Sequence, residues 1–199
     1  AGVAVGTAIV IGSAPVWATA IECMRGGARP APGRLFGLSI AIAGGVLMAT
    51  AGREDFSVSL SALGVCLSAG LAYASFTVMT KELVGSLSPI RATALSFTLA
   101  MFLAFAVAFA ASPLPVLTLK GIGVTLYLGL LTTGAAYLLF SSGLRHLKAS
   151  TGVALSLLEP VTAFLLAVTV AGEAVTFSAV VALILLLGGL FLVLRNEDS

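Results

Sequence analysis

The chain alternates between long apolar stretches and short segments that hold most of its charged residues. A helix needs about 20 predominantly apolar residues to cross the hydrocarbon core of a membrane. Stretches of this kind carry no charged residue, except that one of them contains Glu159. They span residues 1–21, 35–52, 56–80, 92–119, 121–144, 149–172 and 174–194. This pattern predicts an all-α fold, a polytopic membrane helical bundle with seven transmembrane helices.

The fourth stretch, 92–119, is too long for a single membrane-crossing helix. It contains Pro113 and Pro115 toward its C-terminal end. Proline removes a backbone donor, and the residue before it is biased away from helical geometry. We therefore expect this helix to end near Ser112.

The composition places the chain in lipid rather than in water. Hydrophobic residues make up 59% of the 199 residues, charged residues make up 9%, and the mean hydropathy is +1.16. Soluble domains usually carry about 25% charged residues. A chain this poor in charge needs an apolar solvent, so the lipid bilayer is its expected partner. Its net charge of +2 is spread between the stretches, so nucleic acid is not an expected partner.

The lysines and arginines predict the orientation of the stretches. If successive stretches cross in opposite directions, two of these residues fall on one side, namely Arg53 and Lys120. The other side receives Arg25, Arg29, Arg34, Lys81, Arg91, Arg145, Lys148 and Arg195. Positive charge is retained on the cytoplasmic side. The C-terminal tail, 196–199, is therefore predicted to be cytoplasmic, and Ala1 to face outward.

A stretch near the start of the chain is repeated near its end. The sequence Pro-Val-Trp-Ala at 15–18 returns as Pro-Val-Thr-Ala at 160–163. The second copy lies five apolar stretches after the first. The further echoes are Gly27 with Gly172 and the glycine pair 44–45 with 188–189. An odd number of crossings gives the copies opposite directions. Inverted repeats of this kind are typical of secondary transporters.

The repeat also suggests how the chain is divided. A unit of five spans would occupy 56–195, and residues 1–52 would be the last two spans of a first unit. Residues 196–199 form the tail. The chain lacks an initiator Met, and we expect that it begins partway through a longer protein and lacks three opening spans.

Glu159 is the ionisable residue that lies deepest in an apolar stretch. It is eleven positions from Lys148 and thirteen from Gly172, which at about 1.5 Å per residue places it near the bilayer centre. A carboxylate there costs at least about 2.5 kcal/mol, so we expect it to face the protein interior or water and to have a function. The structural alternative is a protonated side chain that hydrogen-bonds a neighbouring helix.

Pro160 follows Glu159 and removes the donor that would pair with the carbonyl of Ser156. We therefore predict a helix break that places a carboxyl group beside an unpaired carbonyl. On a regular helix, Gly152, Ser156, Glu159 and Ala163 share a small, polar face. A face of this kind suits a helix that borders a cavity.

Other hydroxyl and aromatic side chains are candidates to contact a polar solute. They are Tyr73 and Thr77 in 56–80, Thr133 and Tyr137 in 121–144, and Trp17 beside a second predicted helix-breaking proline, Pro15. The alternatives are ordinary interhelical hydrogen bonding for the hydroxyls, and membrane anchoring or packing for Trp17.

No residue pattern predicts a metal site, a cofactor or a catalytic site. Cys23 and Cys66 show neither CxxC nor Cys/His spacing, so no disulfide framework or zinc site is indicated. His146 stands at the end of a stretch and is interpreted as interfacial. Glu173 is interpreted as a solvated loop charge.

The closing part of the chain resembles an EamA-type permease of the drug/metabolite transporter superfamily. The resemblance rests on Ser-Leu-Leu-Glu-Pro-Val at 156–161, Gly-Glu-Ala at 172–174 and the glycine pair 188–189; the upstream copy at 15–18, with the pair 44–45, resembles the end of that family's first repeat. It implies a bacterial inner-membrane carrier of ten spans with both termini cytoplasmic. Such carriers move small metabolites, often amino acids or related compounds, through a cavity between the repeats.

The main hypothesis is a permease that works by alternating access. One alternative is a non-transporting membrane scaffold subunit, and another is an intramembrane enzyme that uses Glu159. The enzyme is disfavoured because chemistry usually needs a partner group, and no second intramembrane carboxylate is present. A small-molecule solute is the expected partner, while a proton as coupling ion and a homodimer are left open.

Overall fold

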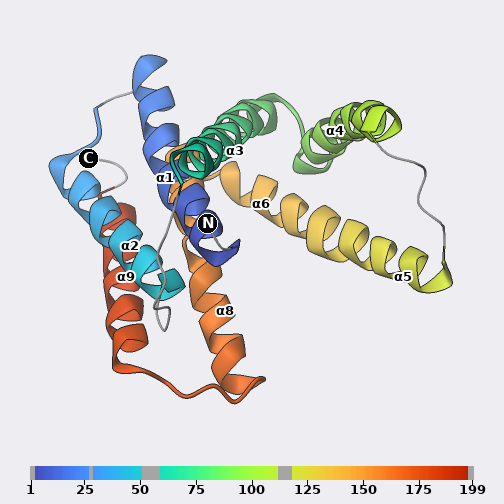
Figure 1. The fold of residues 1–199 in the computed structure, drawn as a ribbon. Helices are drawn as coiled ribbons and strands as arrows, with labels where there is room; N and C mark the ends of the chain where they lie inside the picture. The colour runs from blue at the N-terminus through green and yellow to red at the C-terminus, as the bar shows by residue number, and fades with distance from the viewer. Residues whose placement is uncertain (1–2, 27–28, 51–58, 112–117, 197–199) are drawn as a thin grey trace. The chain divides into compact units, whose positions relative to one another are not determined.

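The computed structural model describes residues 3–26, 29–50, 59–111 and 118–196, whose regular secondary structure is helical throughout and includes no strand (Figure 1). The first helices are α1 (Val3–Met24), α2 (Pro32–Thr50), α3 (Leu60–Ser86) and α4 (Pro89–Ala111). A continuous helical segment then comprises α5 (Leu119–Tyr127), the π-helix η1 (Leu128–Ala135) and α6 (Ala136–Leu144). The chain continues through α7 (Ala149–Leu155), α8 (Leu158–Thr169) and α9 (Phe177–Arg195).

The structure confirms the predicted all-α membrane fold. Of the described helical segments, six are long and apolar enough to cross a membrane, and Pro32–Met48 is apolar but shorter. The described part of α4 extends to Ala111, and the predicted end at Ser112 lies outside the described residues. Pro113 and Pro115, to which that prediction appealed, lie outside the described residues.

Several helices extend beyond the charges that delimited the predicted stretches. The helix α2 begins at Pro32, before Arg34, and α4 begins at Pro89, before Arg91. Proline is favoured at the first position of a helix because its missing N–H would be unpaired there anyway. Long cationic side chains can remain on a helix near a membrane surface. A charge therefore marks the end of the apolar region rather than the end of the helix.

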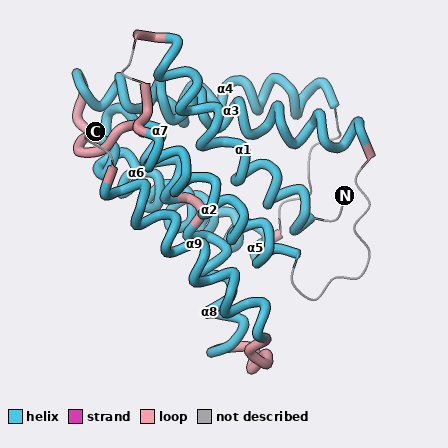
Figure 2. Tube along the Cα trace, turned by 90° about the vertical axis from the view of Figure 1, so that its left-hand side faces the viewer, coloured by secondary structure: helices cyan, strands magenta, loops and turns pink. Residues whose placement is uncertain are grey.

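The chain divides into two compact units. The first comprises residues 1–78 and 148–199, and the second comprises residues 79–147. In the first unit, α2 packs along α9, and α1 packs against both α7 and α2. Figures 1 and 2 both show α2 beside α9. The hydrophobic core between these helices includes Leu38, Ala41, Ala154, Leu157, Leu186 and Leu190.

Glycines allow α2 and α9 to approach closely. A β-carbon on Gly37 would lie 2.6 Å from Leu192 Cβ, and one on Gly44 would meet the backbone of Leu186. A β-carbon on Gly189 would meet the backbone of Ala41. Small residues favour close helix packing in membranes, where no hydrophobic driving force brings helices together. Gly44 and Gly189, each from one of the echoed glycine pairs, thus serve the same interface.

In the second unit, α4 packs against α6. Val84, Ala92 and Leu144 form its buried cluster, and the Thr93 hydroxyl donates to Ser141 Oγ over 2.9 Å. The Lys81 ammonium group donates to the carbonyl of Leu144 over 2.7 Å at the C-terminus of α6. A cation is favourable there because the last carbonyls of a helix have no partner within it.

Candidate functional site

A cavity of about 560 Å³ lies within the first unit. Its wall comes from the first half of α1, the second half of α2, α8, the segment after α8 and the start of α9. Most of the lining residues are apolar or small, and the polar ones are Thr7, Glu159, Glu173 and Thr176. The cavity is therefore mainly apolar, with two carboxyl groups and two hydroxyl groups on its wall.

Glu159 lies in the first turn of α8 and lines this cavity. Its side chain is exposed rather than packed against another helix. No hydrogen bond to its carboxyl group is found among the described residues. The alternative role, a protonated side chain that hydrogen-bonds a neighbouring helix, therefore has no partner in the described part of the chain. An open carboxylate on an apolar wall can accept hydrogen bonds from a solute, pair with a cationic group or take up a proton.

A short interruption of the helix sets the position of Glu159. The helix α7 ends at Leu155 and α8 begins at Leu158. The Ser156 amide donates to the Val153 carbonyl over 3.1 Å, and the Glu159 amide donates to the Ser156 carbonyl over 3.0 Å. These are contacts between residues three apart, which is the tighter 3₁₀ pattern.

Two details of the sequence prediction are corrected here. The carbonyl of Ser156 is not unpaired, because the tighter turn brings the Glu159 amide into reach when Pro160 offers no donor. The cavity-facing surface also differs from the predicted face, because the interruption changes the helical phase. Gly152 is buried, and neither it nor Ser156 lines the cavity. The residues on this segment that do so are Leu157, Glu159, Pro160, Ala163, Phe164 and Ala167.

The structure brings together three of the predicted site residues beside the cavity lining. The hydroxyl groups of Tyr73 and Ser156 lie 2.7 Å apart and form a hydrogen bond. The hydroxyl of Thr77 is fully buried and donates to the carbonyl of Tyr73 over 3.0 Å. None of the three lines the cavity. Tyr73 instead fixes the helix interruption that places Glu159.

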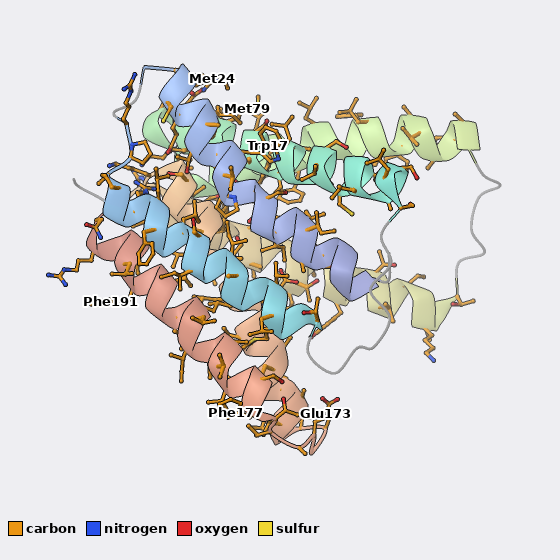
Figure 3. The ribbon with its side chains drawn as sticks, turned by 60° about the vertical axis from the view of Figure 1, so that its left-hand side comes forward. Trp17, Met24, Met79, Glu173, Phe177 and Phe191 are labelled. Carbon is orange, nitrogen blue, oxygen red and sulfur yellow. The ribbon has the colours of Figure 1, made fainter. Side chains whose placement is uncertain are left out.

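Trp17 is a packing residue in this structure. It packs with Ile21 and Tyr73 against a buried cluster that includes Ala14 and Val153. Its indole nitrogen is buried and has no hydrogen-bond partner among the described residues. Figure 3 labels Trp17 on α1, and it does not line the cavity.

The predicted helix break at Pro15 is not observed. The helix α1 continues from Val3 to Met24 with Pro15 inside it, and the Pro15 side chain is fully buried. Burial among packed helices compensates for the one backbone hydrogen bond that proline removes. The two echoed prolines, Pro15 and Pro160, therefore differ in their local structure.

Thr133 and Tyr137 belong to the second unit. Thr133 lies in the π-helix η1, which the sequence pattern did not predict. The Tyr137 ring contacts the edge of Phe97 at a centroid distance of 4.9 Å. Both side chains are half-buried within their own unit, and the cavity is lined by residues of the first unit alone.

Sequence reasoning missed a buried polar cluster that links α1, α2 and α7. The Arg34 guanidinium donates to Ser150 Oγ over 2.6 Å and to Thr151 Oγ1 over 2.9 Å. The Ser150 amide donates to Glu22 Oε1 over 3.2 Å. The sequence pattern places Arg34 just before the apolar stretch 35–52. Pro32 is the signal that places it inside a helix, because proline is common at a helix start.

The cavity and this cluster lie at opposite ends of the same helices. The cavity is lined by Thr7 and Gly12 on α1, whereas Glu22 lies near the other end of that helix. Figure 3 shows Met24, the last residue of α1, and Glu173, which lines the cavity, far apart at opposite ends. Among the described residues, no group of three or more His, Cys, Asp or Glu could hold a metal ion.

The model of the EamA-like transporter family matches residues 60–195. The chain belongs to this family. The match confirms the resemblance that the sequence motifs indicated. Together with the long apolar helices, membership of the EamA family identifies an integral membrane protein of a transporter family.

One relative and one solved structure extend this result. The chain is 34% identical over 194 residues to "Uncharacterized transporter YwfM" of Bacillus subtilis (strain 168). That match covers 96% of this chain but 64% of the relative, so the chain spans less than two thirds of the relative's length. A solved crystal structure matches with a TM-score of 0.78 at 18% identity, over 100% of this chain and 69% of that one. At this identity, the likeness shows a shared fold alone.

Proposed function

We propose that the complete protein is a permease that moves a small organic metabolite across the membrane by alternating access. The observation that carries this proposal is the open carboxylate of Glu159 on the wall of a cavity of about 560 Å³. Cavities that hold small molecules are usually about 300–1,000 Å³. Placing an ionisable group within a membrane span is costly, so such groups usually serve a function.

The distribution of positive charge supports an orientation for this carrier. We place the C-terminus in the cytoplasm and the protein in a bacterial inner membrane. The clustered Glu22 and Arg34 are then at the cytoplasmic end of the first unit, and the cavity opens toward the outer end. The division into a partial first repeat at 1–52 and a second repeat at 56–195 belongs to the same proposal.

The solute that best suits Glu159 carries an amino group, as amino acids and related compounds do. An ammonium group donates hydrogen bonds to a carboxylate, and the pairing is strong where water is scarce. The apolar wall around Glu159 suits an apolar side chain on the solute. Glu159 also has the chemistry of a proton carrier, in which case solute and proton would exchange at the same carboxylate.

The test is solute flux in proteoliposomes that contain the complete protein, measured over a panel of amino acids and related amines. We expect Glu159→Gln, which keeps the size but removes the charge, to lower flux at least about tenfold, the effect of losing a charged hydrogen bond. The matched control is Glu82→Gln, because Glu82 is exposed and lies outside the cavity. That variant keeps normal flux.

The same vesicles test the proton role. An imposed pH gradient drives uphill solute movement in the unmodified protein and has no such effect in Glu159→Gln. Normal, gradient-driven flux in Glu159→Gln would overturn the assigned role of this carboxylate. An absence of flux for every solute in the panel would favour the scaffold alternative instead.

A further inference from the structure

The polar cluster at the end opposite the cavity is built from side chains of three helices. Arg34 is 6% exposed, and its two hydroxyl partners, Ser150 and Thr151, are 2% and 0% exposed. One nitrogen of Arg34, Nη2, donates to both hydroxyl groups. A charged group buried to this extent requires hydrogen-bond partners. These two contacts join α2 to the first turn of α7.

Glu22 joins α1 to the same turn. Its carboxylate accepts a hydrogen bond from the backbone amide of Ser150. The first amides of a helix have no partner within the helix, and a carboxylate is favourable there. The start of α7 is therefore held from two sides, by Glu22 on α1 and by Arg34 on α2.

The helix α7, whose first turn contacts the cluster, is buried among its neighbours. Every residue of α7 from Ala149 to Ala154 is buried. Val153 packs with Ala14 and Ala18 of α1, and Ala154 packs with Leu38 and Ala41 of α2. The segment 149–169 is therefore buried among its neighbours along α7 and borders the cavity along α8.

We propose that Glu22, Arg34, Ser150 and Thr151 form the cytoplasmic gate of the carrier, shut in the structure described. This inference rests on the function proposed above, in which the two ends open in turn. Opening toward the cytoplasm then requires α7 to separate from α1 and α2, which breaks the Arg34 and Glu22 hydrogen bonds together.

The chemistry of the cluster suits a contact that must open repeatedly. The described partners of Arg34 are neutral hydroxyl groups, and water can replace them with similar hydrogen bonds once the end opens. A closely paired buried carboxylate would hold the guanidinium far more strongly. The cluster thus favours the shut state without locking it.

The test uses thiol labelling from each side of the membrane. All native cysteines of the complete protein, Cys23 and Cys66 among them, are first replaced by alanine. One reporter is then introduced at a time. Ala154→Cys reports on the gate end, where the side chain is 1% exposed, and Ala163→Cys reports on the cavity. A membrane-impermeant maleimide is added to right-side-out or inside-out vesicles.

We expect Arg34→Ala to change the two reporters in opposite directions. Labelling of Ala154→Cys from the cytoplasmic side rises at least about tenfold, because Arg34→Ala removes both hydrogen bonds of a charged group to α7. Labelling of Ala163→Cys from the outer side falls, because the outward-open population is depleted. The matched control is Arg29→Ala, which removes an arginine that is exposed and changes neither rate.

A second variant keeps the test decisive if Arg34→Ala fails to fold. Thr151→Val conserves shape and leaves Ser150 as an acceptor for Arg34, so the same opposite shifts are expected at smaller size. If labelling rises at both reporters, the cluster is only a structural brace and the gate is overturned. Unchanged labelling overturns it too. Flux of the unmodified protein is measured separately. If it shows no flux, the proposed carrier function is contradicted. If flux is normal but neither labelling rate changes, only the proposed gate is contradicted.

Discussion

At the residue scale, the position of Glu159 depends on a short run of tight turns. The Ser156 carbonyl loses its usual donor to Pro160 and accepts from the Glu159 amide instead. The Tyr73 hydroxyl then holds Ser156 from a neighbouring helix. The sequence predicted both the acid and the interruption, because an acid followed by proline is conspicuous in an apolar stretch.

The energetic link between Tyr73 and Ser156 can be measured with a double-mutant cycle. Tyr73→Phe, Ser156→Ala and the double variant each remove the shared hydrogen bond. Interhelical hydrogen bonds in membranes contribute about 0.6 kcal/mol on average, so we expect a coupling energy of this size in unfolding free energy. Tyr127→Phe, at an exposed tyrosine, is the control. Strict additivity of the two single changes would show that the hydrogen bond does not stabilise the interruption.

The partners of these residues were beyond sequence reasoning. Arg34 and Ser150 are 116 positions apart, and no local pattern reports a contact between segments so distant in the chain. The same limit applies to Trp17, whose packing depends on α3 and α7. The hydroxyl of Tyr73 was correctly singled out as polar and intramembrane, but its partner was found only in the structure.

At the element scale, the helices follow the apolar stretches closely because the membrane requires each crossing to satisfy its own backbone. The π-helix η1 was not predicted, since its wider hydrogen-bonding pattern has no distinctive composition. The contact of α2 with α9 was not predicted, because the two glycine pairs were interpreted only as matching positions of a repeat. The structure shows that one glycine of each pair, Gly44 and Gly189, lies at this contact.

The neighbouring glycines of α9 give a matched test of that contact. A β-carbon on Gly189 would overlap the Ala41 backbone, whereas one on Gly188 would meet nothing within 4 Å. We expect Gly189→Ala to lower the unfolding free energy by about 1–3 kcal/mol, the usual cost of overpacking. Gly188→Ala is expected to change it by no more than about 0.5 kcal/mol, as for other substitutions that touch nothing.

The measurement is the thermal unfolding midpoint of the purified complete protein in detergent. A lower midpoint for Gly189→Ala and an unchanged one for Gly188→Ala would support the close approach. Equal midpoints for the two variants would contradict the described packing of α2 against α9.

At the scale of the whole molecule, the first unit combines a mainly apolar cavity that contains Glu159 at one end with a buried polar cluster at the other. In the orientation proposed from the charge bias, these ends lie on the outer and cytoplasmic sides. The chain belongs to a transporter family, and the proposed function gives this unit a role in transport. In the proposed transport cycle, solute enters the Glu159 cavity from the outer side.

Solute protection of the cavity tests that claim most directly. In the complete protein without native cysteines, Ala163→Cys is labelled with an impermeant maleimide from the outer side, with and without a saturating transported solute. The account predicts that solute slows this labelling severalfold. Labelling of Ala171→Cys, at an exposed position after α8 that does not line the cavity, stays unchanged. If a transported solute leaves the labelling rate of Ala163→Cys unaltered, or if that residue is labelled only from the cytoplasmic side, the account is contradicted.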